Sequence, residues 1–158
     1  MRVGITGHRG LTAEVAEQVQ QLLDTALRDC PPGELVAVSC LADGPDTWFA
    51  QAALELGGRL EAVVPAELYR DSLPDWHHAA YDALLSRAVV VHRTGLIASD
   101  PHAHMAGSEV LVGLADELLA VWDGKPARGY GGTADVVAYA GRMGVPVRVL
   151  WPLGAGRG

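Results

Sequence analysis

Short apolar runs alternate with segments of helical periodicity along most of the chain. The apolar runs predict strands at residues 2–6, 35–40, 60–64, 88–92, 118–122 and 145–150. Because they are continuous rather than alternately polar and apolar, these runs are typical of strands covered on both faces, as in a parallel sheet. We therefore predict an α/β fold, a Rossmann-like three-layer domain with a mostly parallel sheet of about six strands.

Helices are predicted between the strands, from apolar spacing and from turn formers. The first begins at Thr12, a residue type favoured at N-caps, and stops at Pro31-Pro32-Gly33. Residues 66–86 are ambiguous because Pro74 interrupts them, and we interpret them as a loop or short helix followed by a helix from residue 75. The remaining helices are predicted at residues 47–56, 108–115 and 133–142, and the polar loops at 94–106 and 123–132.

Composition places the chain among ordinary globular domains. It has 158 residues, of which 49% are hydrophobic and 20% charged, so we expect one domain over residues 1–153 and a flexible tail over 154–158. The net charge is -7 and no basic stripe occurs, which argues against binding to a nucleic-acid backbone. No apolar run approaches the roughly 20 residues of a membrane span.

The cysteines and the first residues bear on the compartment. Cys30 and Cys40 form no C-x-x-C pair, and free thiols are the expected state in a reducing cytosol. The first residues predict a strand followed by a glycine turn, which does not fit a signal peptide. A cytoplasmic protein is therefore expected.

Ligands of open parallel sheets bind beyond the carboxyl ends of the strands, so we consider the loops found there. After the first strand, Gly7, His8 and Arg9 stand in a glycine loop where the backbone could approach a ligand and Arg9 could pair with a phosphate. A tight turn with an exposed arginine is an equally good interpretation. The spacing fits neither a dinucleotide fingerprint nor a Walker loop.

The loop after the second strand contains two carboxylates and a glycine. Asp43 or Asp46 either caps the next helix or binds a ribose hydroxyl, and capping is favoured. Gly44 lies between them.

The loop after the fifth strand carries the strongest signal. Gly131, Gly132 and Thr133 stand directly before a helix, where backbone amides and the helix dipole form a natural anion site. We expect the two glycines to expose their amides there, although a structural turn is the alternative. Trp122 ends the strand and either stacks on a base or packs as a wall, and Asp123 follows it.

Histidines in the predicted loop 94–106 raise the question of a metal. His102 and His104 have the spacing of two ligands, but no third ligand accompanies them, so no metal site is predicted. Exposed loop histidines, or a contact to a substrate base, are the interpretations retained. His77 and His78 are expected to be a solvated or packed pair.

Three segments of the chain resemble the SLOG superfamily of Rossmann-like proteins, which includes the lonely guy phosphoribohydrolases, the DprA-like domains and the YpsA-like proteins. They are GITGHR, LADGPDTWFAQAALELG and LADELLAVWDGKPARGYGGTADVVAYAGRMGVPV. The resemblance covers residues 2–152 and is nearest to the YpsA-like branch. It implies a nucleotide or nucleotide-derived ligand at this sheet edge, with no resident cofactor. It also implies that these residues approach the ligand: Gly7, Arg9, Gly44, Asp123, Gly131, Gly132 and Thr133.

The chain departs from the enzymatic branch at two positions. The glutamate of the lonely guy motif P-G-G-x-G-T-x-x-E falls on Val136, and the preceding arginine falls near Gly107. Asp135 and Glu109 are the candidate substitutes for the catalytic carboxylate. The favoured function is therefore a ligand-binding protein of the sensor or carrier type.

Two alternative functions are kept open. The first is an N-glycosidic hydrolase of nucleoside 5′-monophosphates, so whether the protein is an enzyme is left open. A weaker alternative is an interaction domain of the DprA-like kind. The resemblance also implies a homodimer that pairs through helices. The apolar helix around Val110, Leu111, Val112 and Leu114 is a candidate surface, unless it faces the sheet.

Overall fold

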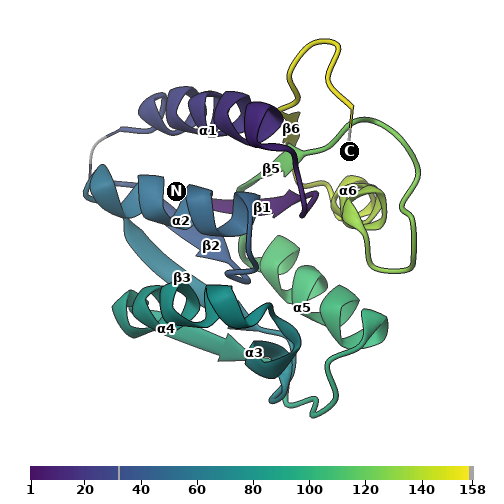
Figure 1. Cartoon of the computed structure of the whole chain (residues 1–158). Coiled ribbons are helices and arrows are strands. Elements are labelled where there is room, and N and C mark those ends of the chain that lie inside the picture. The colour runs from purple at the N-terminus through teal and green to yellow at the C-terminus, as the bar shows by residue number, and fades with distance from the viewer. Residues whose placement is uncertain (32, 157–158) are drawn as a thin grey trace.

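The computed structural model describes residues 1–31 and 33–156 and has a six-stranded sheet at its centre (Figure 1). The strand order is β4-β3-β2-β1-β5-β6 and every neighbouring pair is parallel. The predicted α/β, Rossmann-like architecture is confirmed. The strands are β1 (Arg2–Gly7), β2 (Val36–Ser39), β3 (Arg59–Val64), β4 (Val90–Arg93), β5 (Glu117–Val121) and β6 (Val147–Val149).

Helices cover both faces of the sheet. Figure 1 shows α1, α2 and α4 along one side and α5 and α6 along the other. Each side has its own apolar cluster, the first around Val19, Phe49 and Tyr81 and the second around Leu111 and Val136. The helices are α1 (Ala13–Arg28), α2 (Pro45–Glu55), α3 (Tyr69–Ser72), a 3-10 turn (Asp75–His77), α4 (His78–Arg87), α5 (Pro101–Leu114) and α6 (Thr133–Arg142).

The connectivity creates a crevice beside β1. The chain proceeds from β1 to β4 in one direction and then returns, so that β5 pairs with β1 in the register Gly7↔Val121. Because parallel crossovers are right-handed, the connections that leave β1 and β5 pass to opposite faces of the sheet. In open α/β sheets, ligands bind in the crevice that such a reversal leaves at the carboxyl ends of the strands.

Local signals set the boundaries of the first and last helices. Thr12 is the N-cap of α1, and its Oγ1 accepts a hydrogen bond from Val15 N. Helix α6 begins at Thr133, directly after the glycine pair, as predicted. The segment around Pro74 also forms the predicted short helix followed by a longer one.

Helix α5 is the main correction to the predicted elements. It begins at Pro101, whereas residues 94–106 were predicted to be a loop and the helix to begin at residue 108. The Asp100 side chain accepts a hydrogen bond from Ala103 N at 2.8 Å, and proline is favoured at a first helical position because its missing N–H would have no partner there. Residues 94–100 do precede the helix, but His102 and His104, which suggested that the loop continued, lie in its first turns.

The described residues bear on three smaller expectations. Cys30 and Cys40 are both free thiols. Within the described part of the chain, no helix is long and apolar enough to cross a membrane. Residues 157 and 158 of the predicted tail, and Pro32 of the predicted helix stop, lie outside the described residues. The Trp151 Nε1 donates to Ala155 O at 3.0 Å, so the beginning of the tail is tied to the domain.

Candidate functional site

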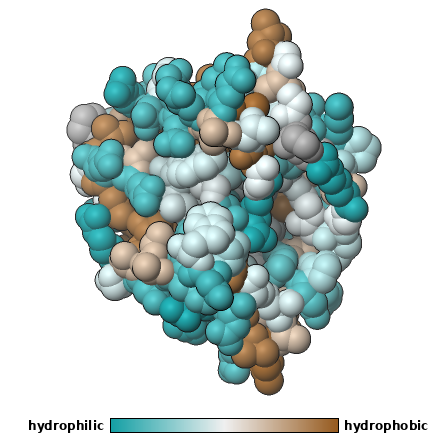
Figure 2. Space-filling model, viewed as in Figure 1, coloured by the Kyte–Doolittle hydropathy of each residue, from teal (hydrophilic) through white to brown (hydrophobic). Residues whose placement is uncertain are grey.

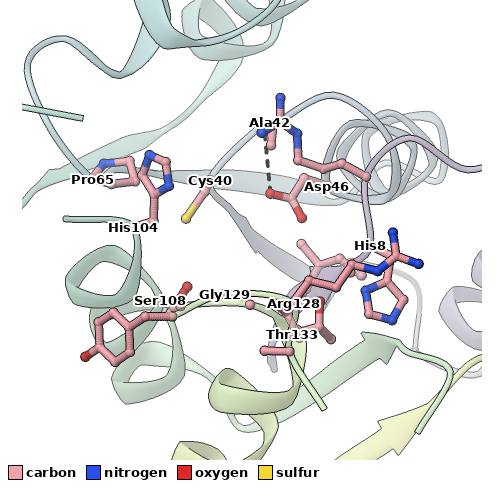
Figure 3. Close-up of a pocket in the computed structure, with 18 of the residues that line it drawn as sticks. His8, Cys40, Ala42, Asp46, Pro65, His104, Ser108, Arg128, Gly129 and Thr133 are labelled. Atoms are coloured by element: carbon pink, nitrogen blue, oxygen red, sulfur yellow. Dashed lines mark hydrogen bonds between the residues drawn. The ribbon is translucent and has the colours of Figure 1, made fainter. Parts of the chain in front are cut away.

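A cavity of about 390 Å³ lies at the carboxyl edge of the sheet, beside the reversal of strand order (Figure 3). Its walls come from the loop after β1, the β2–α2 connection, α5 and the loop that precedes α6. The size is within the range of small-molecule sites. Seven residues predicted to bind a ligand line it, namely Gly7, His8, Arg9, Asp46, Gly131, Gly132 and Thr133.

The β1 glycine is required by packing. A Cβ atom at Gly7 would lie 2.9 Å from both the Pro45 Cβ and the Val121 Cβ. Neither neighbour is at the end of a flexible side chain, so a larger residue would push α2 or β5 away from β1. Gly7 therefore keeps the loops that line the cavity close together.

Arg9 lies at the cavity but already has a partner. Its Nε donates to the Asp43 Oδ1 at 2.9 Å, and its side chain remains 46% exposed. Gly44, directly after Asp43, has a φ of +92° and packs behind Arg9. Asp43 therefore orients the guanidinium, which keeps donors available because arginine has five N–H groups.

His8 joins the two loops that flank the crevice. Its Nε2 lies 3.2 Å from the Asp123 Oδ1, and its backbone N–H donates to Val121 O. Gly44, Trp122 and Asp123, which were also predicted to approach the ligand, are not among the lining residues in the described part of the chain. The Trp122 Nε1 donates to Lys125 O, so this indole closes its own loop.

The glycine loop differs from its prediction in one respect. The expected free amides already have acceptors, because Gly131 N donates to the Asp135 Oδ2 at 2.9 Å and Gly132 N donates to Gly129 O at 3.4 Å. The amides at the positive end of α6 are instead those of the next two residues. Thr133 N and Ala134 N belong to the first turn, where an amide has no acceptor within its own helix.

Glycine is needed in this loop for steric reasons as well. Gly131 has a φ of +82°, and a Cβ there would lie 2.9 Å from Pro101 O. A Cβ at Gly132 would lie 2.8 Å from the Ala127 Cβ. Both glycines are therefore turn formers that also bring the loop against α5.

Asp46 is the most unusual ionisable group at the cavity. It does not cap α2, since Gly44 is the N-cap and no side chain caps that helix, so the favoured capping interpretation was wrong. Its Oδ2 accepts only a long hydrogen bond, from Ala42 N at 3.4 Å (Figure 3). Burial raises the pKa of Asp46 to about 7, against the smaller lowering by Ala42 N–H and by the charge of Arg9.

Three other polar side chains of the cavity wall are uncharged at neutral pH. Burial raises the pKa of the Cys40 thiol and of the Tyr69 hydroxyl well above their ordinary values. Burial, with the charge of Arg9, lowers the pKa of His104, whose Nε2 bonds the Ser99 Oγ at 2.8 Å. Asp46 therefore stands in a neutral polar wall that also includes Ser108.

Sequence reasoning missed most of this wall. His104 was noticed but assigned to a loop, whereas it lies within α5 and faces the cavity. Tyr69 comes from α3 and Cys40 follows β2, and neither stands in a motif. The position of Cys40 at the carboxyl end of a strand was the one available signal. His77 is the packed member of its pair: its Nε2 donates to Leu41 O at 2.9 Å and lies 3.3 Å from the Thr47 Oγ1.

The two candidate catalytic carboxylates occupy different places. Glu109 lies on α5, and Asp135 is held by Gly131 N; neither is among the cavity-lining residues that the structure describes. Over residues 1–31 and 33–156, no group of three His, Cys, Asp or Glu side chains could hold a metal ion. The expected absence of a metal remains a prediction.

Comparison with known proteins supports the fold assignment. No family model matches the chain. No curated protein sequence matches it either. Solved structures do match. DNA processing protein A (DprA) from Streptococcus pneumoniae has a TM-score of 0.73 at 22% identity, over 99% of this chain and 52% of that one. The chain has the fold of the SLOG proteins.

Two further structures place this fold in different functional settings. DprA from Helicobacter pylori, described as binding single-stranded DNA, matches with a TM-score of 0.69 at 17% identity, over 99% of this chain and 68% of that one. The molybdenum cofactor binding protein from Rippkaea orientalis matches with a TM-score of 0.58 at 18% identity, over 94% of this chain and 74% of that one. The chain spans about half the length of the pneumococcal protein.

Proposed function

We propose that the protein binds a small phosphorylated, nucleotide-like molecule in the cavity at the carboxyl edge of the sheet. The observation that carries this proposal is the position of the cavity at the reversal of strand order, between the loop after β1 and the first turn of α6. Two arginines, Arg9 and Arg128, line it together with that helix start. These groups favour an anion, and the cavity volume suits a nucleoside monophosphate.

The anion site is formed by the start of α6 rather than by the glycine amides. Thr133 N and Ala134 N are the donors that have no intrahelical acceptor. The Gly131 amide is held by Asp135, which fixes the loop that presents Thr133. A phosphate at this point would interact with the helix dipole and with Arg9 across the cavity.

A thermal-shift comparison tests this function. Nucleoside 5′-monophosphates should raise the melting temperature, because a ligand that binds only the native state stabilises it by mass action, by about 2.7 kcal/mol at 100 times its Kd. The parent nucleosides should produce a much smaller shift. Equal shifts with nucleosides and monophosphates would contradict a phosphate site.

The hydrolytic alternative depends on a different residue from those expected. An oxocarbenium-like transition state needs a carboxylate nearby, and Asp46 is the only carboxylate among the described residues that line the cavity. Neither Glu109 nor Asp135 lines it. Chromatography of a nucleoside monophosphate incubated with the protein would detect a released free base, which the binding function does not produce.

The partners implied by the neighbouring folds lead to two subsidiary proposals. One neighbour binds single-stranded DNA by its description, but the net charge of -7 in this chain disfavours binding to a phosphate backbone, and we expect no such binding.

We retain the homodimer as a proposal. Its candidate surface is reduced, because Leu111 and Val112 are buried against the sheet. In Figure 2 the apolar residues of the visible face stand in separate small groups.

A further inference from the structure

The cavity has two chemically different ends. Arg128 and Thr133, at the first turn of α6, lie at one end in Figure 3 and provide positive charge and amide donors. Asp46, Cys40 and His104 lie at the other end. Arg9 is near enough to Asp46 and His104 for its charge to lower the pKa of both. This inference deepens the proposed function and rests on it: if the phosphate lies at the α6 start, the rest of the ligand lies against the neutral wall.

Asp46 is half-buried at the cavity and uses little of its capacity to accept hydrogen bonds. Among the residues that the structure describes, its side chain accepts one hydrogen bond, the 3.4 Å contact from Ala42 N. The Arg9 Nε and Nη2 both donate to the Asp43 Oδ1 and not to Asp46. A carboxylate has about four lone-pair sites, so Asp46 has acceptor capacity for a ligand in the cavity.

The contacts of Asp46 also indicate which kind of ligand group completes it. A carboxylate only accepts hydrogen bonds, and the contact that Asp46 already has, from Ala42 N, is long at 3.4 Å. A ligand that brings N–H donors fits this group, because a carboxylate accepts two parallel N–H groups in a bidentate pair. A planar ring with an amino group beside a ring N–H presents that pair of donors.

We propose that Asp46 recognises the heterocycle of the ligand, as a carboxylate that accepts both donors of a 2-amino-4-oxopyrimidine edge such as that of guanine. The phosphate of the same ligand lies at the start of α6. The ring therefore bridges the two ends of the cavity, and Tyr69 and His104 provide neutral hydrogen-bonding groups beside it. Adenine, which pairs one donor with one acceptor on its corresponding edge, meets repulsion between its ring nitrogen and the carboxylate.

Calorimetric titration with three nucleotides tests the proposal without any substitution. Guanosine monophosphate presents both donors, inosine monophosphate lacks the 2-amino group, and adenosine monophosphate replaces the ring N–H by an acceptor. The proposal predicts that the guanine nucleotide binds about tenfold or more tightly than either of the others. Equal or tighter binding of the adenine nucleotide would overturn it.

The substitution Asp46→Asn provides a second, independent arm. Asparagine keeps one carbonyl acceptor but places an NH₂ donor opposite one of the ring donors, so the affinity for guanosine monophosphate should fall by about tenfold or more. The affinity for adenosine monophosphate should rise, because the asparagine amide offers one donor and one acceptor to the adenine edge and removes the repulsion. Asp24→Asn, an equal charge change at an exposed position on α1, is the matched control and should leave both affinities unchanged.

The outcomes separate this inference from the proposed function. If the three nucleotides bind equally well and Asp46→Asn binds like the parent, while the nucleosides still bind weakly, the phosphate site stands and the role of Asp46 is refuted. If no nucleotide binds the parent protein, both proposals fail. Because the three-nucleotide comparison uses the parent protein, a folding defect in Asp46→Asn does not affect the test.

Discussion

Two carboxyl groups of this domain, one buried and one half-buried, lie in opposite surroundings. Glu61, on β3, is 3% exposed and has a partner for each oxygen: the Arg2 Nε lies 3.0 Å from its Oε2 and the His92 Nε2 lies 2.7 Å from its Oε1. Asp46, half-buried at the cavity, has only the long contact from Ala42 N among the described residues. Burial by itself raises the pKa of both groups, but the hydrogen bonds to His92 and Arg2 reverse the effect at Glu61 and lower its pKa.

The number of hydrogen-bond donors distinguishes a structural carboxylate from one that is available to a ligand. Desolvation penalises the charged form in both places, and the number of donors decides which form the folded protein favours. Glu61 is completed by the protein and ties β3 to β1 and β4. Asp46 is left incomplete at the point where the fold leaves a cavity, which is the usual arrangement at functional sites.

The largest expected effect is on the completed carboxylate. Glu61→Ala should lower the free energy of unfolding by about 3 kcal/mol, because it removes two hydrogen bonds of a buried carboxylate, one to the half-exposed Arg2 and one to His92. Glu67→Ala, at an exposed position, is the control. Urea unfolding would measure both variants. A loss of less than about 1 kcal/mol for Glu61→Ala would mean that the hydrogen bonds of Glu61 to Arg2 and His92 contribute no more than an exposed ion pair.

The same variant should show a defined pH dependence. The lowered pKa means that the ionised Glu61 stabilises the fold above the unfolded-state pKa of 4.5, and that this contribution is lost as the pH falls through the folded-state value. The difference in stability between the parent and Glu61→Ala should therefore shrink in acid. A difference that stays constant from pH 7 to pH 3 would argue that Glu61 acts through packing alone.

The incomplete carboxylate should respond in the opposite sense. Its pKa is about 7 in the folded protein, against an ordinary value of 3.8, so ionisation of Asp46 costs stability progressively as the pH rises from about 4 to 7. Asp46→Asn removes this cost. The variant should be more stable than the parent by about 2 kcal/mol at pH 8 and nearly equal to it at pH 4, as thermal unfolding would show. Lower stability of the variant at pH 8 would contradict the account.

A smaller effect is expected for Arg9→Ala, measured as ligand affinity. The affinity for a nucleoside monophosphate should fall by about 1.5 kcal/mol, the lower end for a hydrogen bond to a charged group, because Arg9 is half-exposed and shared with Asp43. The free energy of unfolding should change by about 1 kcal/mol or less. The affinity for the nucleoside should not change, and an equal loss for both ligands would remove Arg9 from the phosphate site.

The smallest effect is expected at the start of α6. Thr133→Val keeps the shape of a buried residue but removes a hydroxyl that faces the cavity, and nucleotide affinity should fall by about 1 kcal/mol. Unchanged affinity would assign the anion contact to the backbone amides alone. Titration calorimetry resolves a difference of this size.

Much of the fold was visible in the sequence, because strand patterns and caps are local signals. The strand at residues 2–6 and the helix at 133–142 follow from apolar runs and from the Gly131-Gly132 pair, and the structure confirms both. The start of α5 was misplaced because the polar residues before it and the histidines in its first turns resembled a continuous loop. Asp100 and Pro101 were the helix-start signal that should have outweighed them.

The site was less predictable than the fold, because its chemistry depends on contacts between distant segments. The wall around Asp46 combines Cys40, Tyr69 and His104, which come from three elements and share no spacing. The Asp135 side chain that engages Gly131 N could not be inferred from a glycine motif. The sequence resemblance of the chain to the YpsA-like branch, rather than to the other SLOG branches, stays a prediction.

Asp46, about half ionised at pH 7 in the ligand-free protein, is expected to become fully ionised when a donor-bearing ring binds. Titration calorimetry of guanosine monophosphate at pH 7, in two buffers of different ionisation enthalpy, measures the protons released on binding. The parent and Asp46→Asn share the other charged and titratable groups around this position, namely Arg9, Asp43, Cys40, Tyr69 and His104. With a pKa of about 7, the parent should release about half a proton more per nucleotide than the variant. Equal proton release by the two proteins would contradict the claim.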